Sequence, residues 1–201
     1  MIYHINEENP QQRLIDKAVE ILEKDGVIIY PTDTVYAYGC DISCKKAIET
    51  IYRIKKIENK KPLSFVFTDI SQMKDYIRNM SDKAYKVMKK VAPGPYTFIF
   101  NASKLIPKLV TTKQKTIGVR IPDNNIARDL VQRLGRPILS ASVNTSEGEY
   151  IIEPGDLEKV FRNEVDLVID AGPKYSEPST IIDFTSGDPL IVREGKGEIN
   201  F

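Results

Sequence analysis

The stretch VIIYPTDTVYAYGCD at residues 27–41 decides the fold. It opens with a β-branched, apolar run from Val27 to Tyr30, which predicts a buried strand. Pro31 cannot donate a hydrogen bond to a sheet, so the segment PTDT (31–34) is expected at a strand end or in a turn. Loops at such positions often bind ligands. This stretch therefore predicts a strand followed directly by a candidate binding loop.

The residues after this stretch predict a helix and a second strand. Between Ser43 and about Lys56, four apolar side chains share one helical face: Ala47, Ile48, Ile51 and Tyr52. The segment LSFVF, which begins at Leu63, then reads as a strand. Strand, helix and strand in this order favour a parallel crossover, the unit of an α/β protein.

The rest of the chain continues this alternation. Periodic apolar residues and stop signals predict helices before Gly26, between Ser81 and Pro93, from Asn125 to Leu134, and from about Pro154. Further strands are predicted at 96–100, 116–122, 138–142, 166–170, 179–184 and 189–194. No linker or internal repeat interrupts the series. We therefore expect one α/β domain over residues 1–201, with a single twisted, open, mixed sheet flanked by helices.

Composition limits the classes of function. The chain has 201 residues and a net charge of +1, so affinity for a polyanion would require local clusters of Lys and Arg. No signal sequence and no run of about 18 apolar residues is present, which predicts a cytoplasmic protein without membrane contact. Cys40 and Cys44 lack a second pair or a nearby histidine, so we expect reduced structural thiols and no metal site.

Common catalytic arrangements are missing from the sequence. The one histidine, His4, lies near the N-terminus in a predicted edge strand, so a Ser-His-Asp or Cys-His arrangement is disfavoured and a structural role is expected. No glycine-rich phosphate-binding motif occurs. A nucleotide site would therefore have to be built from other groups.

Hydroxyl side chains gather where strands are predicted to end. The three clusters are Thr32 and Thr34, then Ser140, Ser142, Asn144 and Ser146, then Ser179 and Thr180. Ligands of open α/β sheets bind at strand ends. Such residues also cap helices and form local turns, and that explanation suffices for any one cluster alone. Three clusters together favour a binding site.

Three cations are candidates for anion binding. Arg120 and Arg193 stand inside the apolar segments IGVRIP and LIVRE, where an unpaired buried charge would be costly. Each needs an anion, which is either a neighbouring carboxylate, such as Asp123 or Glu194, or a ligand. Lys55 lies at the end of the second predicted helix, where it either faces solvent and complements the helix dipole or binds a ligand.

The sequence resembles the YrdC-like domain family, and within it the YciO branch. The resemblance rests on YPTDTVYAYGCD (30–41), Lys55 with KPLSF (61–65), GPYTFIF (94–100), KTIGVRIP (115–122), LSASVNTS (139–146), PSTIIDF (178–184) and VREG (192–195). These motifs span nearly the whole chain. They imply a twisted α/β sheet with a concave basic cleft.

The resemblance also implies partners and site residues. Members of this family bind double-stranded RNA and make threonylcarbamoyl-AMP from threonine, bicarbonate and ATP, with magnesium, for tRNA modification. By motif position, the implied threonine or carbamate pocket consists of Thr32, Arg120, Ser140 and Ser179. The implied nucleotide pocket consists of Lys55, Thr116, Ser142, Asn144 and Arg193. No catalytic side chain is implied, because the carbamate of threonine is itself the nucleophile.

Two departures from the synthase pattern leave the activity open. Ile57 and Glu58 stand where synthases carry an arginine and a proline, and Glu147 stands where a glycine is expected, one place before Gly148. One hypothesis is a threonylcarbamoyl-AMP synthase with altered cleft residues. A second is an enzyme that hydrolyses the threonylcarbamoyl group of tRNA. A third is an RNA-binding module that uses the basic segments 53–61 and 104–115 with Lys89 and Lys90.

Overall fold

The computed structural model describes residues 1–57, 63–110, 114–144, 149–161, 163–174 and 177–200. Its α-helices are α1 (Gln12–Glu23), α2 (Lys45–Ile54), α3 (Ile70–Met73), α4 (Asp82–Val91), α5 (Asn125–Leu134) and α6 (Pro154–Phe161), with a 3-10 turn, η1 (Lys74–Tyr76). Its strands are β1 (Ile2–His4), β2 (Ile28–Tyr30), β3 (Ala37–Asp41), β4 (Ser64–Val66), β5 (Ile77–Arg78), β6 (Tyr96–Ala102), β7 (Thr116–Arg120), β8 (Ile138–Ser142), β9 (Leu167–Asp170), β10 (Thr180–Asp183) and β11 (Leu190–Arg193).

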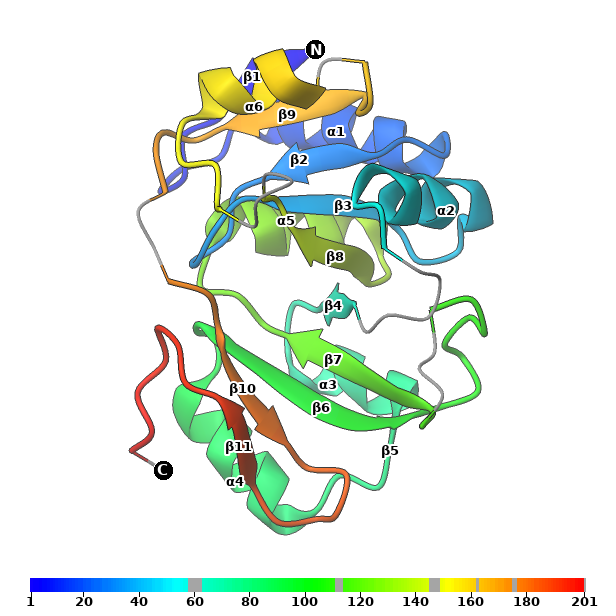
Figure 1. Cartoon of the computed structure of the whole chain (residues 1–201), viewed down its shortest axis with the longest axis vertical. Coiled ribbons are helices and arrows are strands. Elements are labelled where there is room, and N and C mark those ends of the chain that lie inside the picture. Colours follow the sequence, from blue (N-terminus) through cyan, green and yellow to red (C-terminus); the bar gives the residue numbers. More distant parts are fainter. Residues whose placement is uncertain (58–62, 111–113, 145–148, 162, 175–176, 201) are drawn as a thin grey trace.

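In the described residues, all strands join one open sheet. Its order is β1-β9-β2-β3-β8-β4-β7-β6-β10-β11, and β5 pairs with β6. Strand β9 lies between β1 and β2 and is parallel to both, whereas β3 is antiparallel to β2 and to β8. Figure 1 shows the short β4 between the group of strands around β8 and the group around β7. The predicted single α/β domain with an open, mixed sheet is confirmed.

The predicted parallel crossover between the strands near residues 28 and 65 is wrong. Strand β3, which the sequence pattern does not predict, follows the 31–34 segment and turns back antiparallel to β2. Strands β3 and β8 separate β2 from β4 in the sheet. Because each neighbour along β2-β3-β8-β4 is antiparallel, β4 runs opposite to β2. Helix α2 therefore connects β3, and not β2, to β4.

Two hydrophobic clusters cover the two faces of the sheet. Alternate strand residues point to opposite faces, so Ile28 and Ile29 belong to different clusters. Buried side chains of α1 and α5 pack in the cluster that contains Ile28. Those of α2, α4 and α6 pack in the larger cluster that contains Ile29. The sheet is therefore flanked by helices on both faces, as expected.

Local capping explains where several helices begin and end. The Ser81 and Asn124 side chains accept hydrogen bonds from backbone amides in the first turns of α4 and α5. Helix α5 ends at Gly135, whose left-handed conformation suits glycine. Cys44 Sγ accepts from the Ala47 amide at the start of α2, and both cysteines are free and buried, which agrees with the expected structural role.

The expected edge position of His4 is confirmed, since it lies in β1 at the end of the sheet. Its Nδ1 lies 2.9 Å from Asp170 Oδ2 on β9. Within the described ranges, no helix combines the length and the hydropathy that crossing a membrane requires.

Candidate ligand-binding cleft

A cleft of about 320 Å³ opens where β8 extends past the start of β4. Its lining residues come from the loops and strands on both sides of β4: Ala37, Lys55, Leu63, Ser64, Thr97, Arg120, Ser140, Ala141, Ser142, Asn144, Tyr150, Ser179, Ile181 and Arg193. This lining carries three cations and six hydroxyl groups, counting Tyr150, but neither a carboxylate nor a histidine among the described residues. The cleft is therefore suited to an anionic ligand rich in hydrogen-bonding oxygens.

Two serines form the floor of the cleft, within a row of small residues that crosses the sheet. The strand registers pair Gly39 with Ser140, Ser140 with Ser64, and Ser64 with Gly118, so these residues form one row across β3, β8, β4 and β7. A Cβ atom at Gly118 would lie 3.1 Å from Thr97 Cγ2 and 3.2 Å from Ser64 Oγ. Ser140 and Ser64, in the middle of this row, therefore present their hydroxyl groups to the cleft.

Arg120 lies in the wall of the cleft and already has an intramolecular acid. Its Nη2 donates to Asp33 Oδ1 at 2.7 Å and to Thr34 Oγ1 at 3.0 Å, and both charged side chains are only 7% exposed. The carboxylate alternative is therefore confirmed for Arg120, but the acid is Asp33 and not the nearby Asp123. Arg120 Nε is buried and has no hydrogen-bond partner among the described atoms. The Nε–H group of Arg120 is therefore a buried donor without an acceptor among the described atoms.

The PTDT segment is a turn held together by its own hydroxyl groups. Thr32 Oγ1 donates to the Val35 carbonyl at 2.7 Å and accepts from the Thr34 amide at 3.1 Å. Asp33 Oδ2 accepts from the Asp123 amide at 3.1 Å. The turn that follows the buried strand β2 therefore presents the Asp33 carboxylate to Arg120.

Lys55 reaches into the cleft from the C-terminal end of α2. Its Nζ donates to the Ser142 carbonyl and to Asn144 Oδ1, each at 2.7 Å, and it lies 5.8 Å from the centre of the Tyr38 ring. Burial lowers the pKa of Lys55 below the usual value for lysine. The structure therefore supports the site alternative for Lys55 over a solvated helix end.

Arg193 lies in a different environment from the one that the sequence suggested. Strand β11 is an edge strand, and Arg193 and its neighbour Val192 are exposed, so the expectation of a buried arginine here is wrong. The guanidinium group donates to the Ser179 carbonyl at 2.7 Å from Nη2 and 3.1 Å from Nε. It has no ion pair within the described part of the chain. Its charge is therefore available at the mouth of the cleft.

A pair of hydroxyl groups lies beside Arg193. Ser179 Oγ is 2.7 Å from Thr97 Oγ1, and both residues are buried in the wall of the cleft. Ser179 Oγ also accepts from Arg193 Nη2 at 3.3 Å. This pair places two hydroxyl groups and one cation within reach of the same ligand.

Seven of the nine residues expected in the site line this cleft: Lys55, Arg120, Ser140, Ser142, Asn144, Ser179 and Arg193. Thr32 instead lines a neighbouring cavity on the Asp33 side of the Asp33–Arg120 pair. Thr116 lies on β7, four residues before Arg120. Ser146, Glu58, Glu147 and Gly148 lie outside the described residues.

Three polar residues of the cleft are not among those expected from the sequence. Ser64 and Thr97 enter it through the register of β4 and β6, and Tyr150 enters it through an isolated bridge to Asn144. Only strand pairing brings these side chains together, so no local sequence signal could have found them. Ile57, which replaces the expected arginine, is partly buried against the larger hydrophobic cluster.

The fold and this cleft define an α/β protein with a candidate site suited to a small anionic ligand. The family model described as "Telomere recombination", of the Sua5, YciO and YrdC proteins, matches residues 20–195, and the chain therefore belongs to this family. The chain is 41% identical to YciO of Escherichia coli strain K12, over 98% of this chain and 96% of that protein. It is 33% identical to the threonylcarbamoyl-AMP synthase of Coxiella burnetii strain RSA 493, over 88% of this chain and 95% of that protein.

Two solved structures of the family are similar throughout this chain. The crystal structure of E. coli YciO has a TM-score of 0.93 at 40% identity and covers 100% of this chain and 98% of its own. P. abyssi Sua5 in complex with L-threonine has a TM-score of 0.90 at 26% identity, covering 97% of this chain and 57% of its own. Of these relatives, YciO is more similar to the chain than the synthase is.

Proposed function

We propose that the cleft binds an adenosine nucleotide together with threonine, and that the protein acts in the chemistry of threonylcarbamoyl-AMP for tRNA modification. The observation that carries this proposal is the convergence of Lys55, Arg120 and Arg193, from three separate elements, on one cleft lined with hydroxyl groups. The synthase of C. burnetii and the threonine complex of Sua5 support it.

The composition of the cleft fits a reaction in which the substrates supply the nucleophile. Threonine and bicarbonate form a carbamate, whose oxygen attacks the α-phosphorus of ATP while pyrophosphate leaves. No protein nucleophile is needed, so the protein aligns the reactants and stabilises the developing charge. The described residues contain no cluster of acids or histidines that could hold a metal ion, so magnesium would be bound mainly by the triphosphate.

The proposed nucleotide subsite consists of Lys55, Thr116, Ser142, Asn144 and Arg193. Lys55 and Asn144 are joined by a hydrogen bond of 2.7 Å, so one ligand group could contact both. Tyr150 is the one aromatic residue among the described lining residues and offers a face for the base. The proposed threonine subsite consists of Arg120, Ser140 and Ser179, with Thr32 behind the Asp33–Arg120 pair.

The Arg193→Ala variant tests the nucleotide subsite. Removing a charge-assisted hydrogen bond to phosphate is expected to weaken ATP binding by about tenfold to a hundredfold. Isothermal titration calorimetry with ATP and magnesium measures this effect. The matched control is Arg133→Ala, since Arg133 forms a surface pair with Asp16 away from the cleft. Equal ATP affinity in the parent and in Arg193→Ala would contradict the subsite.

The Ile57→Arg variant tests the synthase activity itself. Both proteins are incubated with ATP, threonine, bicarbonate and magnesium, and pyrophosphate release is followed. Restoring a cation beside the phosphates is expected to raise the rate by about one to two decades. Absence of pyrophosphate from both proteins would remove the synthase assignment, while ATP and threonine binding would still be tested separately.

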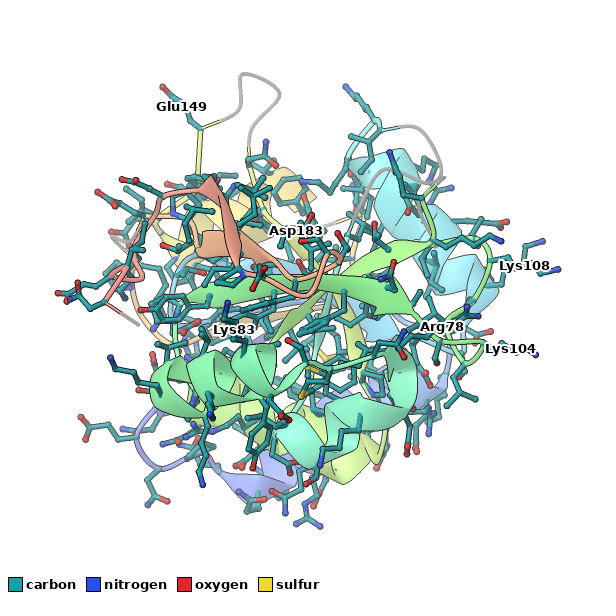
Figure 2. All side chains as sticks on the ribbon, turned by 90° about the horizontal axis from the view of Figure 1, so that it is seen from below. Arg78, Lys83, Lys104, Lys108, Glu149 and Asp183 are labelled. Carbon is teal, nitrogen blue, oxygen red and sulfur yellow. The ribbon has the colours of Figure 1, made fainter. Side chains whose placement is uncertain are left out.

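A specific observation favours RNA binding as a second candidate function. Four exposed cations, Arg78, Lys104, Lys108 and Lys115, gather where β5, β6 and β7 meet, and we call them the basic corner. Arg78 pairs with Asn101 on β6, and the Ala102 amide donates to the Lys115 carbonyl at 2.8 Å. Figure 2 shows Arg78, Lys104 and Lys108 on the same side of the molecule.

The basic corner consists of exposed cations and lies near the cleft. Its four cations form no ion pair within the residues that the structure describes. Strand β7 runs from Thr116, beside this corner, to Arg120 in the cleft, a path of about 13 Å at the usual rise of a strand. RNA phosphates bound at the corner would therefore lie close to the ligand in the cleft.

A further inference from the structure

Tyr30 is a buried residue whose hydroxyl group contacts Ser140 in the wall of the cleft. It lies in β2, is 0% exposed, and its hydroxyl donates to Ser140 Oγ at 2.8 Å. Ser140 lines the cleft from β8. Because a hydroxyl that accepts one hydrogen bond still has its own proton to donate, this contact determines where the Ser140 proton can point.

The surroundings leave the cleft as the open direction for this proton. Among the described residues, Ser140 Oγ contacts no hydrogen-bond acceptor besides the donating Tyr30 hydroxyl. The opposite residue on β3 is Gly39, which offers no side chain, and on β4 it is Ser64, which also lines the cleft. A ligand oxygen is therefore the available acceptor.

The Tyr30 ring is fixed in position by its neighbours. A Cβ atom at Gly39 would lie 2.7 Å from Tyr30 Cε1, so the ring occupies the space that this glycine leaves. Burial raises the pKa of Tyr30 to about 12, so its hydroxyl stays protonated at neutral pH. The donor therefore keeps one position and one protonation state.

We propose that Tyr30 is a positioning residue that makes Ser140 a dedicated hydrogen-bond donor, so that this point of the cleft selects a ligand carboxylate or carbamate oxygen over a donor group. This inference rests on the proposed threonine subsite and adds a source of selectivity to it. The Thr97–Ser179 pair differs, because either of its hydroxyl groups can be the donor. A chain of two hydroxyl groups also strengthens the final hydrogen bond by mutual polarisation.

The test compares L-threonine with L-threoninamide, in which an NH₂ donor replaces one carboxylate oxygen. Calorimetric affinities are measured for the parent and for Tyr30→Phe, which keeps the ring and removes its hydroxyl. In the variant, Ser140 Oγ is free to accept a hydrogen bond. The preference for threonine over threoninamide is therefore expected to fall by about fivefold to tenfold.

Two further variants separate positioning from structural support. Tyr36→Phe is the matched control, because Tyr36 is also buried and its hydroxyl donates to the Gly172 carbonyl at 2.7 Å, away from the cleft. It is expected to leave the ligand preference unchanged. If Tyr30 acts through Ser140, adding Tyr30→Phe to Ser140→Ala is expected to cause no further change in the preference, which a double-mutant cycle measures.

Each outcome has a definite meaning. Two outcomes would overturn the positioning role and leave the proposed function standing. One is an unchanged preference for threonine over threoninamide in Tyr30→Phe. The other is an equal loss of affinity for both ligands, together with the same fall in melting temperature as in Tyr36→Phe. Absence of threonine binding by the parent would overturn the positioning role and the threonine subsite together. Loss of ATP binding alone would count against the proposed function and leave this preference measurable.

Discussion

Arg120 forms a buried ion pair within the fold and also lines the candidate ligand site. Its Nη2 group is neutralised by Asp33 in a setting where both side chains are 7% exposed, and its Nε remains unpaired among the described atoms. A buried pair contributes little net stability while intact, yet it is costly to break because a lone buried charge remains. Asp33 therefore holds the Arg120 guanidinium group in the wall of the cleft.

The first prediction concerns the Asp33→Asn variant. It leaves the Arg120 cation buried without a carboxylate, so the free energy of unfolding is expected to fall by about 3–5 kcal/mol. Urea denaturation at neutral pH, with the slope checked against the parent, measures this change. The control is Asp123→Asn. In the parent, the Asp123 carboxylate is 67% exposed and pairs with Arg128, so removing it is expected to lower the free energy of unfolding by at most about 1 kcal/mol. Similar losses in both variants would contradict this account.

The sequence predicts some residues of the candidate site but not their partners in the fold. Arg120 and Lys55 could be identified because a cation within an apolar strand or at a helix end stands out locally. The partner Asp33 could not be assigned, because it lies 87 positions away in the chain and is brought there by the sheet. Arg193 was placed in a buried strand because LIVRE is apolar, whereas an edge strand can expose such residues.

At the scale of the elements, strand register creates the floor of the cleft. Gly39, Ser140, Ser64 and Gly118 align only when β3, β8, β4 and β7 pair as observed. A slip of one residue in β8 or β4 would turn Ser140 or Ser64 away from the cleft. The site therefore depends on the register as much as on the identity of its residues.

The second prediction concerns the Gly39→Ala variant. The new methyl group would meet the fully buried Tyr30 ring at 2.7 Å, so overpacking is expected to cost about 1–3 kcal/mol of unfolding free energy. Thermal and urea denaturation measure this loss. Gly155→Ala is the control, because it adds a methyl group in open space at the start of α6 and is expected to be neutral or slightly stabilising. Full stability of Gly39→Ala would show that the ring can move.

Elements were predicted well where their patterns were long. The predicted helix from Asn125 to Leu134 agrees with α5 at both ends, because its apolar face, its Asn cap and its terminal glycine all indicate the same limits. Strand β3 was missed because all five of its residues are buried, so AYGCD lacks the alternation that marks a half-buried strand. That omission produced the wrong crossover.

At the scale of the whole molecule, two candidate binding surfaces lie at the two ends of β7. The cleft contains Arg120, and the basic corner lies beyond Thr116. The near-neutral net charge of the chain hides this local concentration of cations. The basic corner is therefore a candidate surface for a polyanion despite the low net charge.

The third prediction concerns RNA binding through the basic corner. Replacing Arg78, Lys104 and Lys108 by alanine is expected to weaken binding of duplex RNA and to reduce its dependence on salt, by a slope of about 0.7–0.9 for each lost phosphate contact. Fluorescence anisotropy over a series of salt concentrations measures both effects. The matched control replaces the exposed cations Arg13, Lys17 and Lys46, and ATP affinity serves as the check on folding. Equal salt slopes for both triple variants would contradict the surface.

The position of β9 in the sheet has a consequence for biosynthesis. Residues 167–170 fill the space between β1 and β2, although the chain emerges from the ribosome N-terminus first. The first strand can reach its place only after four-fifths of the protein has been made. Until then, β1 and the facing edge of β2 lack the strand that pairs with both, so this part of the sheet closes late in synthesis.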